Sequence, residues 1–257
     1  MNDLTPPRRA LIIGGGSGLG LAASFSLAAQ GWKVFLSGRR RDPLIAAHAM
    51  HAPGQCEWQA ADGTVEAEVK DVVQTCVRRF GGLEALVVSA GVSATGSVVD
   101  ANLEQLEQVF RSNVWPTFLY SQAVVPYLQA KGGAICIVAS ISATMPQRNR
   151  VAYCSSKAAQ VGMVRQMALD LAPFKIRVNA VSPSLVMTDL SRKAIADSPD
   201  PAFTLAARIG VHPLGRIGDA NEVGQAVAYL CSSNASWITG QNLIMDGGRG
   251  LMPGMEA

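Results

Sequence analysis

Tyr153 and Lys157 stand one helical turn apart in the stretch YCSSK, and together they could perform acid–base chemistry. At a spacing of four residues, two side chains lie on the same face of a helix. An isolated phenol loses its proton only near about pH 10, and a neighbouring ammonium group stabilises the phenolate and lowers that pKa. The pair therefore predicts a group that could protonate a carbonyl oxygen or deprotonate an alcohol.

Ser140 directly follows an apolar run at residues 134–139 and could assist the same chemistry. A serine hydroxyl at the end of a strand can donate a hydrogen bond to a carbonyl oxygen, although it can also cap its own loop. Ser142 is a nearby alternative for this role. We therefore expect one of the two hydroxyls beside Tyr153, with Ser140 preferred.

Asn113 is an amide on the apolar side of a helix predicted over residues 103–130, in line with Val109 and Thr117. A buried amide destabilises the fold unless it has hydrogen-bond partners. Pro116 cannot donate a backbone hydrogen bond, so it should kink the helix here. The gap could take an ordered water or open to the active site, or Asn113 could be a purely structural polar group.

The stretch ALIIGGGSGLG at residues 10–20 runs an apolar strand directly into a glycine-rich turn. Gly14, Gly18 and Gly20 have the spacing G-x-x-x-G-x-G, which differs from the common G-x-G-x-x-G pattern. Because glycines lack Cβ atoms, a pyrophosphate can approach the amide groups at a helix N-terminus. The turn predicts dinucleotide binding, with an ordinary tight turn as the alternative.

Three arginines, Arg39, Arg40 and Arg41, follow the next apolar run at residues 33–37. An NAD site usually places a carboxylate at this point to bind the ribose 2′-hydroxyl, whereas arginine accommodates a 2′-phosphate. Guanidinium groups bind phosphate through paired hydrogen bonds. The triplet predicts a preference for NADP(H) over NAD(H), with a solvated basic loop as the alternative.

These candidate residues lie on an alternation of strand-like and helical segments. Seven short β-rich runs are predicted strands: 9–13, 33–37, 56–60, 85–89, 134–139, 176–181 and 242–245. The segments between them have apolar residues at helical spacing and predict helices: 18–30, 42–50, 64–80, 103–130, 153–172 and 219–232. Most strands are apolar throughout, which is typical of strands covered on both faces. The sequence therefore predicts one domain over 1–257, a Rossmann-type, doubly wound α/β fold whose seven parallel strands have helices on both faces.

One long interruption, at about residues 184–215, contains Pro199, Pro201 and Pro213 around FTLAARIG. Long irregular segments of this kind often close over a binding pocket. We expect a substrate lid here, with an ordinary surface excursion as an equal alternative.

The composition excludes several classes of function. The 257 residues carry a net charge of only +3 with no basic stripe, which argues against a nucleic-acid partner. No apolar run reaches the ~20 residues of a membrane span, and the run after Arg9 is too short for a secretory signal. The five scattered cysteines lack CxxC spacing, which favours a reducing cytoplasm over disulfides or zinc. His48 and His51 lack a third ligand, so a polar loop after a helix is favoured over a metal site.

Taken in order, these features resemble the short-chain dehydrogenase/reductase family, and especially its 3-oxoacyl-carrier-protein reductases. The resemblance runs from about Arg8 to Gly248. Its marks are GGGSGLG, Asp62, SAG at 89–91, Asn113, Ser140, YCSSK, IRVNAVSPS at 176–184, HPLGRIGDANEVGQAVAYLCS at 212–232 and ITGQNLIMDGG at 238–248. The chain departs from the family pattern at Ile13, at Val88-Ser89 and at Ser184, none of which removes a reacting group.

The resemblance implies a role for each matching polar residue. Tyr153 would be the general acid in reduction and the base in oxidation. Lys157 would bind the nicotinamide ribose and lower the pKa of the tyrosine. Ser140 would orient the carbonyl group, and Asn113 would hold a proton-relay water.

The implied cofactor and substrate sites are larger. Asp62 would contact the adenine, and Thr188 the carboxamide or the phosphates. The implied cofactor-binding residues are Gly14, Gly16, Ser17, Gly18, Leu19, Arg39, Arg40, Asp62, Gly63, Ala90, Gly91, Tyr153, Lys157, Pro183, Val186 and Thr188. The implied substrate-binding residues are Ser140, Ile141, Ser142, Gln147, Tyr153 and Leu185.

The predicted function is an NADP(H)-dependent oxidoreductase that reduces a small ketone to a secondary alcohol, or performs the reverse reaction. In the family, the helices corresponding to 103–130 and 153–172 usually form a four-helix interface, so a homotetramer or dimer is expected. No metal, nucleic-acid or membrane partner is expected. Two alternatives remain open: a non-catalytic dinucleotide sensor or scaffold, and a lyase or isomerase that uses the same tyrosine.

Overall fold

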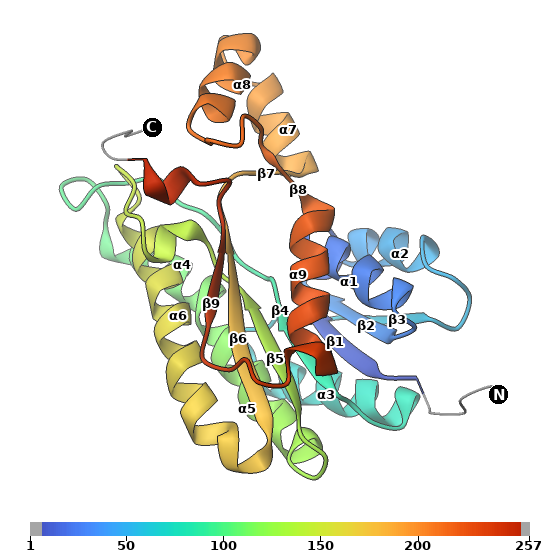
Figure 1. The fold of residues 1–257 in the computed structure, drawn as a ribbon. Coiled ribbons are helices and arrows are strands. Elements are labelled where there is room, and N and C mark those ends of the chain that lie inside the picture. Colours follow the sequence, from blue (N-terminus) through green and yellow to red (C-terminus); the bar gives the residue numbers. More distant parts are fainter. Residues whose placement is uncertain (1–6, 253–257) are drawn as a thin grey trace.

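Seven short segments pair side by side into one parallel sheet in the computed structural model, which describes residues 7–252 (Figure 1). The order across the sheet is β3-β2-β1-β4-β5-β6-β9, and each of its pairings is parallel. The strands are β1 (Arg9–Ile13), β2 (Lys33–Gly38), β3 (Cys56–Ala60), β4 (Ala85–Val88), β5 (Gly133–Val138), β6 (Ile176–Pro183) and β9 (Asn242–Met245). After β3 the chain crosses to the other side of β1. The order therefore reverses between β1 and β4, where doubly wound sheets bind ligands.

Helices cover both faces of this sheet, as the apolar strands require. Alternate residues of β1 point to opposite faces: Ala10 and Ile12 pack with α1, α2 and α9, and Leu11 and Ile13 pack with α3, α5 and α6. The main helices are α1 (Gly18–Ala29), α2 (Arg41–Ala49), α3 (Glu66–Phe80), α4 (Leu103–Asn113), α5 (Trp115–Leu128), α6 (Val151–Leu171) and α9 (Ala220–Cys231). The predicted fold class is thereby confirmed.

The helix predicted over 103–130 is two helices, α4 and α5, with Val114 between them. Pro116 occupies the first turn of α5, where a missing N–H group is tolerated. The break lies where the proline was expected to kink the helix. It leaves Asn113 as the last residue of α4, with its carbonyl group at the junction.

The 184–215 segment carries regular structure of its own. Its elements are the short strand β7 (Val186–Met187), α7 (Asp189–Ala196) and α8 (Pro201–Gly210). β7 pairs with β8 (Gly218–Asp219), which leads directly into α9. Figure 1 shows α7 and α8 standing beyond the carboxyl ends of β6 and β9, at the top of the view.

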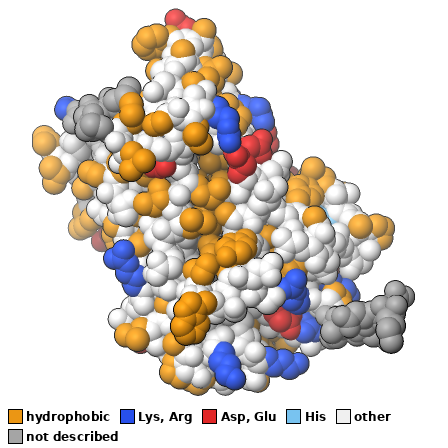
Figure 2. Space-filling model, in the orientation of Figure 1, with side chains coloured by type: hydrophobic (Ala, Val, Ile, Leu, Met, Phe, Trp, Pro, Cys, Tyr) orange, Lys and Arg blue, Asp and Glu red, His pale blue; other side chains and the backbone are white. Residues whose placement is uncertain are grey.

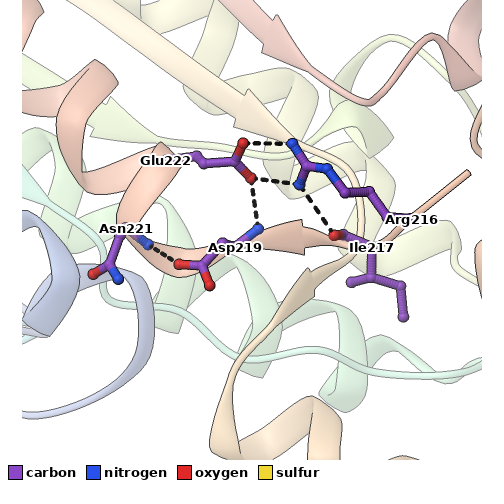
Figure 3. A network of polar contacts seen from close by, with 5 residues as sticks. All are labelled: Arg216, Ile217, Asp219, Asn221 and Glu222. Carbon is purple, nitrogen blue, oxygen red and sulfur yellow. Dashed lines mark hydrogen bonds and ion pairs between the residues drawn. The ribbon is translucent and has the colours of Figure 1, made fainter. Parts of the chain in front are cut away.

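A polar network fixes the start of α9, where the chain returns from the 184–215 segment (Figure 3). Arg216 forms paired hydrogen bonds of 2.8 and 2.6 Å with Glu222. Glu222 also accepts a hydrogen bond from the backbone N–H of Asp219, whose carboxylate accepts one from the N–H of Asn221. The Arg216 hydrogen bond lowers the pKa of Glu222 to about 2. The reciprocal cap stabilises the helix N-terminus and sets the direction of the chain there.

Helices α1 and α9 approach so closely at Gly224 that no side chain fits. A Cβ atom added there would lie 2.5 Å from the carbonyl oxygen of Ala22 and 2.6 Å from Oγ of Ser26. Gly224→Ala should therefore lower the free energy of unfolding by about 1–3 kcal/mol, measured by denaturant unfolding. Gly210→Ala is the matched control, because a Cβ added to Gly210 meets no atom within 4 Å. Equal stability of the two variants would contradict the close packing of α1 on α9.

Candidate active site

The strand register brings the predicted reacting groups to one edge of the sheet. Val138, the last residue of β5, pairs with Val181 of β6, and Ser140 follows two residues later. The next helix, α6, begins at Val151 and carries Tyr153 in its first turn. All the candidate groups therefore lie beyond the carboxyl ends of central strands, as the sequence predicted.

Tyr153 hydrogen-bonds with Ser140, and this contact lowers the pKa of the phenol. Burial acts in the opposite direction and is the larger effect, so the pKa of Tyr153 is raised above its ordinary value. The sequence predicted a lowered pKa through Lys157. Its Nζ atom lies 5.9 Å from the centroid of the tyrosine ring, so the two residues do share one region of the site.

Ser142 lies beside Ser140 and does not replace it. Their hydroxyl groups are 3.2 Å apart, and the backbone N–H of Ser142 donates to Oγ of Ser140 at 3.2 Å. Both residues are buried in or next to the 3₁₀ turn η1 (Ile141–Ala143). Ser142 therefore orients Ser140, and Ser140 is the hydroxyl that contacts Tyr153.

Lys157 is 5% exposed, and its ammonium group is held by two neutral acceptors. Nζ donates to the carbonyl oxygen of Val138 at 3.2 Å and to Oε1 of Gln160 at 2.9 Å. Burial lowers the pKa of Lys157 to about 8. The lysine can support a phenolate through its charge only while it is protonated, so this support weakens above about pH 8.

Asn113 is fully buried, and its side-chain amide holds the segment that follows β4. Oδ1 accepts from the N–H of Val92 at 2.7 Å, and Nδ2 donates to the carbonyl oxygen of Val92 at 3.0 Å. Nδ2 also donates to Oγ of Ser156 at 2.9 Å. This side chain therefore has the partners that a buried amide needs, and it joins α4 and α6 to Val92, the residue directly after the SAG stretch at 89–91.

Gln160 is the polar residue of the site that the sequence analysis missed. It is fully buried, and its Nε2 donates to the carbonyl oxygen of Asn113 at 2.9 Å and to Oγ1 of Thr117 at 2.8 Å. The sequence did carry a signal, because a glutamine three residues after Lys157 must share its face of the helix. Its partners on α4 and α5 come from tertiary packing.

The glycine turn forms a cradle at the start of α1. Gly14 has a φ of +79°, and a Cβ atom added to it would lie 2.8 Å from the backbone nitrogen of Ala90. A Cβ atom on Gly18 would lie 3.9 Å from the methyl group of Thr188. The N-cap residue Ser17 makes no side-chain hydrogen bond to the helix. The first amides of α1 are therefore not capped by a side chain, and this donor set fits a dinucleotide pyrophosphate.

The arginine triplet divides into two kinds of residue. Arg39 and Arg40 are exposed at the carboxyl end of β2. Arg41 is exposed too, but it opens α2, and its guanidinium lies over the ring of Trp58 at 5.4 Å. Asp62 accepts a hydrogen bond of 2.9 Å from the N–H of Thr64. This bond is the main cause of its lowered pKa, to which the charge of Arg39 also contributes.

The remaining implied residues take several positions around this edge. Ile141 and Val186 are buried, whereas Gln147, Leu185 and Thr188 are partly exposed. A separate pocket of about 420 Å³ lies between β7, α7 and α8, and the predicted substrate residues do not line it. Its lining residues are Met187, Arg192, Ile195, Ala196, Pro201, Ala202 and Leu205.

Ser184, one of the departures from the family pattern, ties β6 to the end of the 184–215 segment. Its Oγ lies 3.0 Å from Nε2 of His212, a residue that is 3% exposed. Nδ1 of His212 lies 2.8 Å from the carbonyl oxygen of Arg208. The serine side chain is therefore occupied by a structural contact at the base of this segment.

The HxxH pair spans the end of α2, so the loop that the sequence favoured holds His51 but not His48. His48 lies within α2, and His51 follows it, with its ring stacked on Phe25 at 4.6 Å between centroids. Nε2 of His51 lies 3.1 Å from Oγ of Ser24. Within residues 7–252, no three metal-ligating side chains gather at one place. In the same range, no helix is both long and apolar enough to cross a bilayer.

Comparisons with known proteins agree with this geometry. A family model described as enoyl-(acyl carrier protein) reductase matches residues 14–249. Glucose 1-dehydrogenase of Gluconobacter oxydans is 32% identical over 97% of this chain and 94% of its own length. The 3-oxoacyl-acyl-carrier-protein reductase FabG of Thermotoga maritima is 32% identical over 93% of this chain and 96% of its own length. The structure of levodione reductase superposes with a TM-score of 0.90 at 29% identity, covering 95% of this chain and 98% of that one.

The parallel doubly wound sheet defines a Rossmann-like α/β fold, and Tyr153, Lys157 and Ser140 gather beyond its central strands. The chain belongs to the short-chain dehydrogenase/reductase family, a family of oxidoreductases that act on alcohols and ketones.

Proposed function

We propose that this protein is an NADP(H)-dependent oxidoreductase that interconverts a ketone and a secondary alcohol. The observation that carries the proposal is the grouping of Ser140, Tyr153 and Lys157 at the sheet edge, beside the glycine cradle. Ser140 hydrogen-bonds with Tyr153, and Nζ of Lys157 lies 5.9 Å from the centroid of the tyrosine ring. A bound reduced nicotinamide supplies a hydride to the carbonyl carbon. The chain's own residues must therefore orient the carbonyl oxygen and deliver a proton to it.

Tyr153 is the proposed proton donor, because its raised pKa keeps the phenol protonated at neutral pH. Ser140 donates a second hydrogen bond that fixes the carbonyl oxygen between the two hydroxyls. The charge of Lys157 stabilises the phenolate that remains after transfer. Asn113 is proposed as the fourth catalytic residue, because its side chain holds the backbone of Val92 beside the site. In alcohol oxidation the same tyrosine accepts the proton.

The cofactor residues are proposed by position. The cradle of Gly14, Gly16, Ser17, Gly18 and Leu19 suits the pyrophosphate, and it lies between Ala90 and Thr188. The second part of the site comprises Asp62, Gly63, Gly91, Pro183 and Val186, together with Tyr153 and Lys157. The exposed guanidinium groups of Arg39 and Arg40, beyond β2, suit a ribose 2′-phosphate and favour NADP(H).

The ketone is proposed to enter beside Ser140, Ile141, Ser142, Gln147 and Leu185. The 184–215 segment is proposed as its lid, because α7 and α8 stand beyond the strand ends that carry the site (Figure 1). Such a lid would exclude water from the hydride-transfer step.

A homotetramer is proposed from two separate apolar surfaces. On α5, Trp115 is 47% exposed and Phe118 is 50% exposed beside an apolar hollow of about 450 Å³. Leu243 and Ile244 of the edge strand β9 are 40% and 45% exposed. Figure 2 shows hydrophobic side chains gathered on the face that carries β9. Two different self-contacting surfaces close a tetramer, whereas one closes a dimer.

Initial rates test the proposal, with a panel of ketones run with NADPH and NADH side by side, and the corresponding alcohols run with NADP⁺ and NAD⁺. We expect absorbance loss at the nicotinamide band with at least one ketone, and faster turnover with NADPH. Cofactor binding without turnover across the panel would favour a dinucleotide sensor. Product formation without net cofactor consumption would favour a lyase or isomerase.

A further inference from the structure

Gln160 joins the proposed catalytic lysine to the junction between two other helices. It lies on α6, three residues after Lys157, and is fully buried. Its Oε1 accepts from Nζ of Lys157 at 2.9 Å, and its Nε2 donates to the carbonyl oxygen of Asn113 at 2.9 Å. One side chain thus spans the space between the ammonium group and the end of α4.

A second contact fixes which way the amide points. Nε2 of Gln160 also donates to Oγ1 of Thr117 at 2.8 Å, and that hydroxyl donates to the carbonyl oxygen of Asn113 at 3.2 Å. The two acceptors on the α4–α5 side require the NH₂ group. The carbonyl oxygen of the amide must therefore face Lys157. A flipped amide would place NH₂ against the ammonium group and the amide oxygen against the carbonyl oxygen of Asn113, and both of these bonds would be lost.

The ammonium group has three N–H donors, and two of them are directed by neutral acceptors, Val138 and Gln160. Among the described residues that contact Nζ of Lys157, which are Tyr153, Val138 and Gln160, only Tyr153 has a titratable side chain. A buried ammonium group keeps its charge only when acceptors replace the water that it loses. Gln160 supplies one of these acceptors, and the third N–H remains available to the site.

We propose that Gln160 is a positioning residue, which keeps Lys157 charged and correctly oriented, and whose amide bridges the space between Lys157 and the Asn113 carbonyl. The inference rests on the proposed function for its catalytic meaning. A primary amide accepts and donates hydrogen bonds at different atoms and does not relay a proton as water does. Proton resupply to Tyr153 then reaches the site by a path other than the Asn113 carbonyl.

Direct titration of Lys157 tests this without reference to turnover. In NMR spectra of protein labelled with 13C-lysine, the resonance of Lys157 is the one missing from the Lys157→Arg variant. The pKa of Lys157 read from this resonance should be about 8. Gln160→Leu removes the acceptor and should lower this pKa by about one unit, because a hydrogen bond to a charged group is lost. Gln160→Glu keeps the shape and adds a negative charge, so it should raise the pKa by about one unit.

The matched controls are Gln166→Leu and Gln166→Glu, which make the same changes at an exposed position of the same helix. They should leave the Lys157 titration within about 0.2 unit of the parent value, because an exposed charge is screened by solvent. An unchanged Lys157 pKa in both Gln160 variants would overturn the proposal. If the leucine variant does not fold, the isosteric glutamate variant alone decides it.

Turnover supplies a second and separate readout. In a pH–rate profile, activity should fall at high pH as Lys157 loses its proton. The pH of this fall should be lower in Gln160→Leu and higher in Gln160→Glu than in the parent protein. Gln160→Ala leaves room for a water beside polar groups and should be about tenfold more active than the leucine variant. An alanine variant no more active than the leucine variant would contradict the bridging role. Absence of turnover in the parent protein would count against the proposed function, while the titration would still test the position of Gln160.

Discussion

Tyr153→Phe should lower kcat by about a hundredfold to ten-thousandfold while leaving the Kd for NADPH almost unchanged. A positioned general acid contributes a factor of this size, and the substitution removes only the hydroxyl group that supplies the proton. The phenyl ring keeps its place beside Lys157, so the shape of the site is preserved. Stopped-flow rates with the best ketone of the panel and fluorescence titration with NADPH measure the two effects separately.

Tyr229→Phe is the matched control for this substitution. Tyr229 lies on α9 and is 42% exposed, so the loss of its hydroxyl group should leave both constants within about twofold of the parent values. Retained turnover in Tyr153→Phe would remove the tyrosine from the mechanism. Loss of NADPH binding together with turnover would indicate damage to the cofactor site instead.

The double substitution Arg39→Ser and Arg40→Ser should weaken NADPH binding by about tenfold to a hundredfold and leave NADH binding nearly unchanged. Each guanidinium–phosphate contact is a charge-assisted hydrogen bond worth about 1.5–3 kcal/mol, and a factor of ten corresponds to about 1.4 kcal/mol. NADH lacks the 2′-phosphate and so loses no such contact. Titration of the parent protein and of the double variant with NADPH and with NADH gives the ratio of the two affinities directly.

Arg41→Ser is the control, since it removes a third arginine from the same triplet. Its guanidinium is placed over Trp58, so the ratio of NADPH to NADH affinity should change by less than about threefold. An equal loss of NADPH affinity in the Arg41 variant would show that general positive charge, rather than the positions of Arg39 and Arg40, sets the preference. No loss in the double variant would contradict the proposed phosphate site.

The sheet could be predicted well because its strands are short, apolar and separated by helical periodicity. The predicted strand at 85–89 is β4, Ala85–Val88, and the one at 176–181 is extended to Pro183 in β6. The pair β7 and β8 could not be predicted in this way. Each has two residues, and Gly218–Asp219 has no strand propensity of its own, so only tertiary pairing makes it a strand.

The helices were less predictable at their interruptions. Continuous apolar spacing over 103–130 indicated one helix, although Pro116 marked the place where it ends and restarts. The proline fixes φ and removes a donor, which a sequence reveals, but whether the helix bends or stops depends on what fills the gap. Here the side chains of Gln160 and Thr117 donate to the carbonyl oxygen of Asn113, at the junction of the two helices.

At the site, the sequence located the reacting side chains better than their supporting contacts. Spacing alone placed Tyr153 and Lys157 on one helix face. It could not show that burial raises the pKa of the tyrosine, because that shift depends on the walls of the site. It also could not assign Gln160, whose partners belong to helices more than forty residues away in the chain.

Transfer of deuterium from the cofactor to the product tests the central claim most directly. The protein is incubated with the best ketone and with NADPH carrying deuterium at both C4 positions, and the alcohol is analysed by mass spectrometry and NMR. The account predicts one deuterium on the carbinol carbon for each cofactor oxidised, with the hydroxyl proton taken from solvent. Product whose carbinol hydrogen comes from solvent would contradict it.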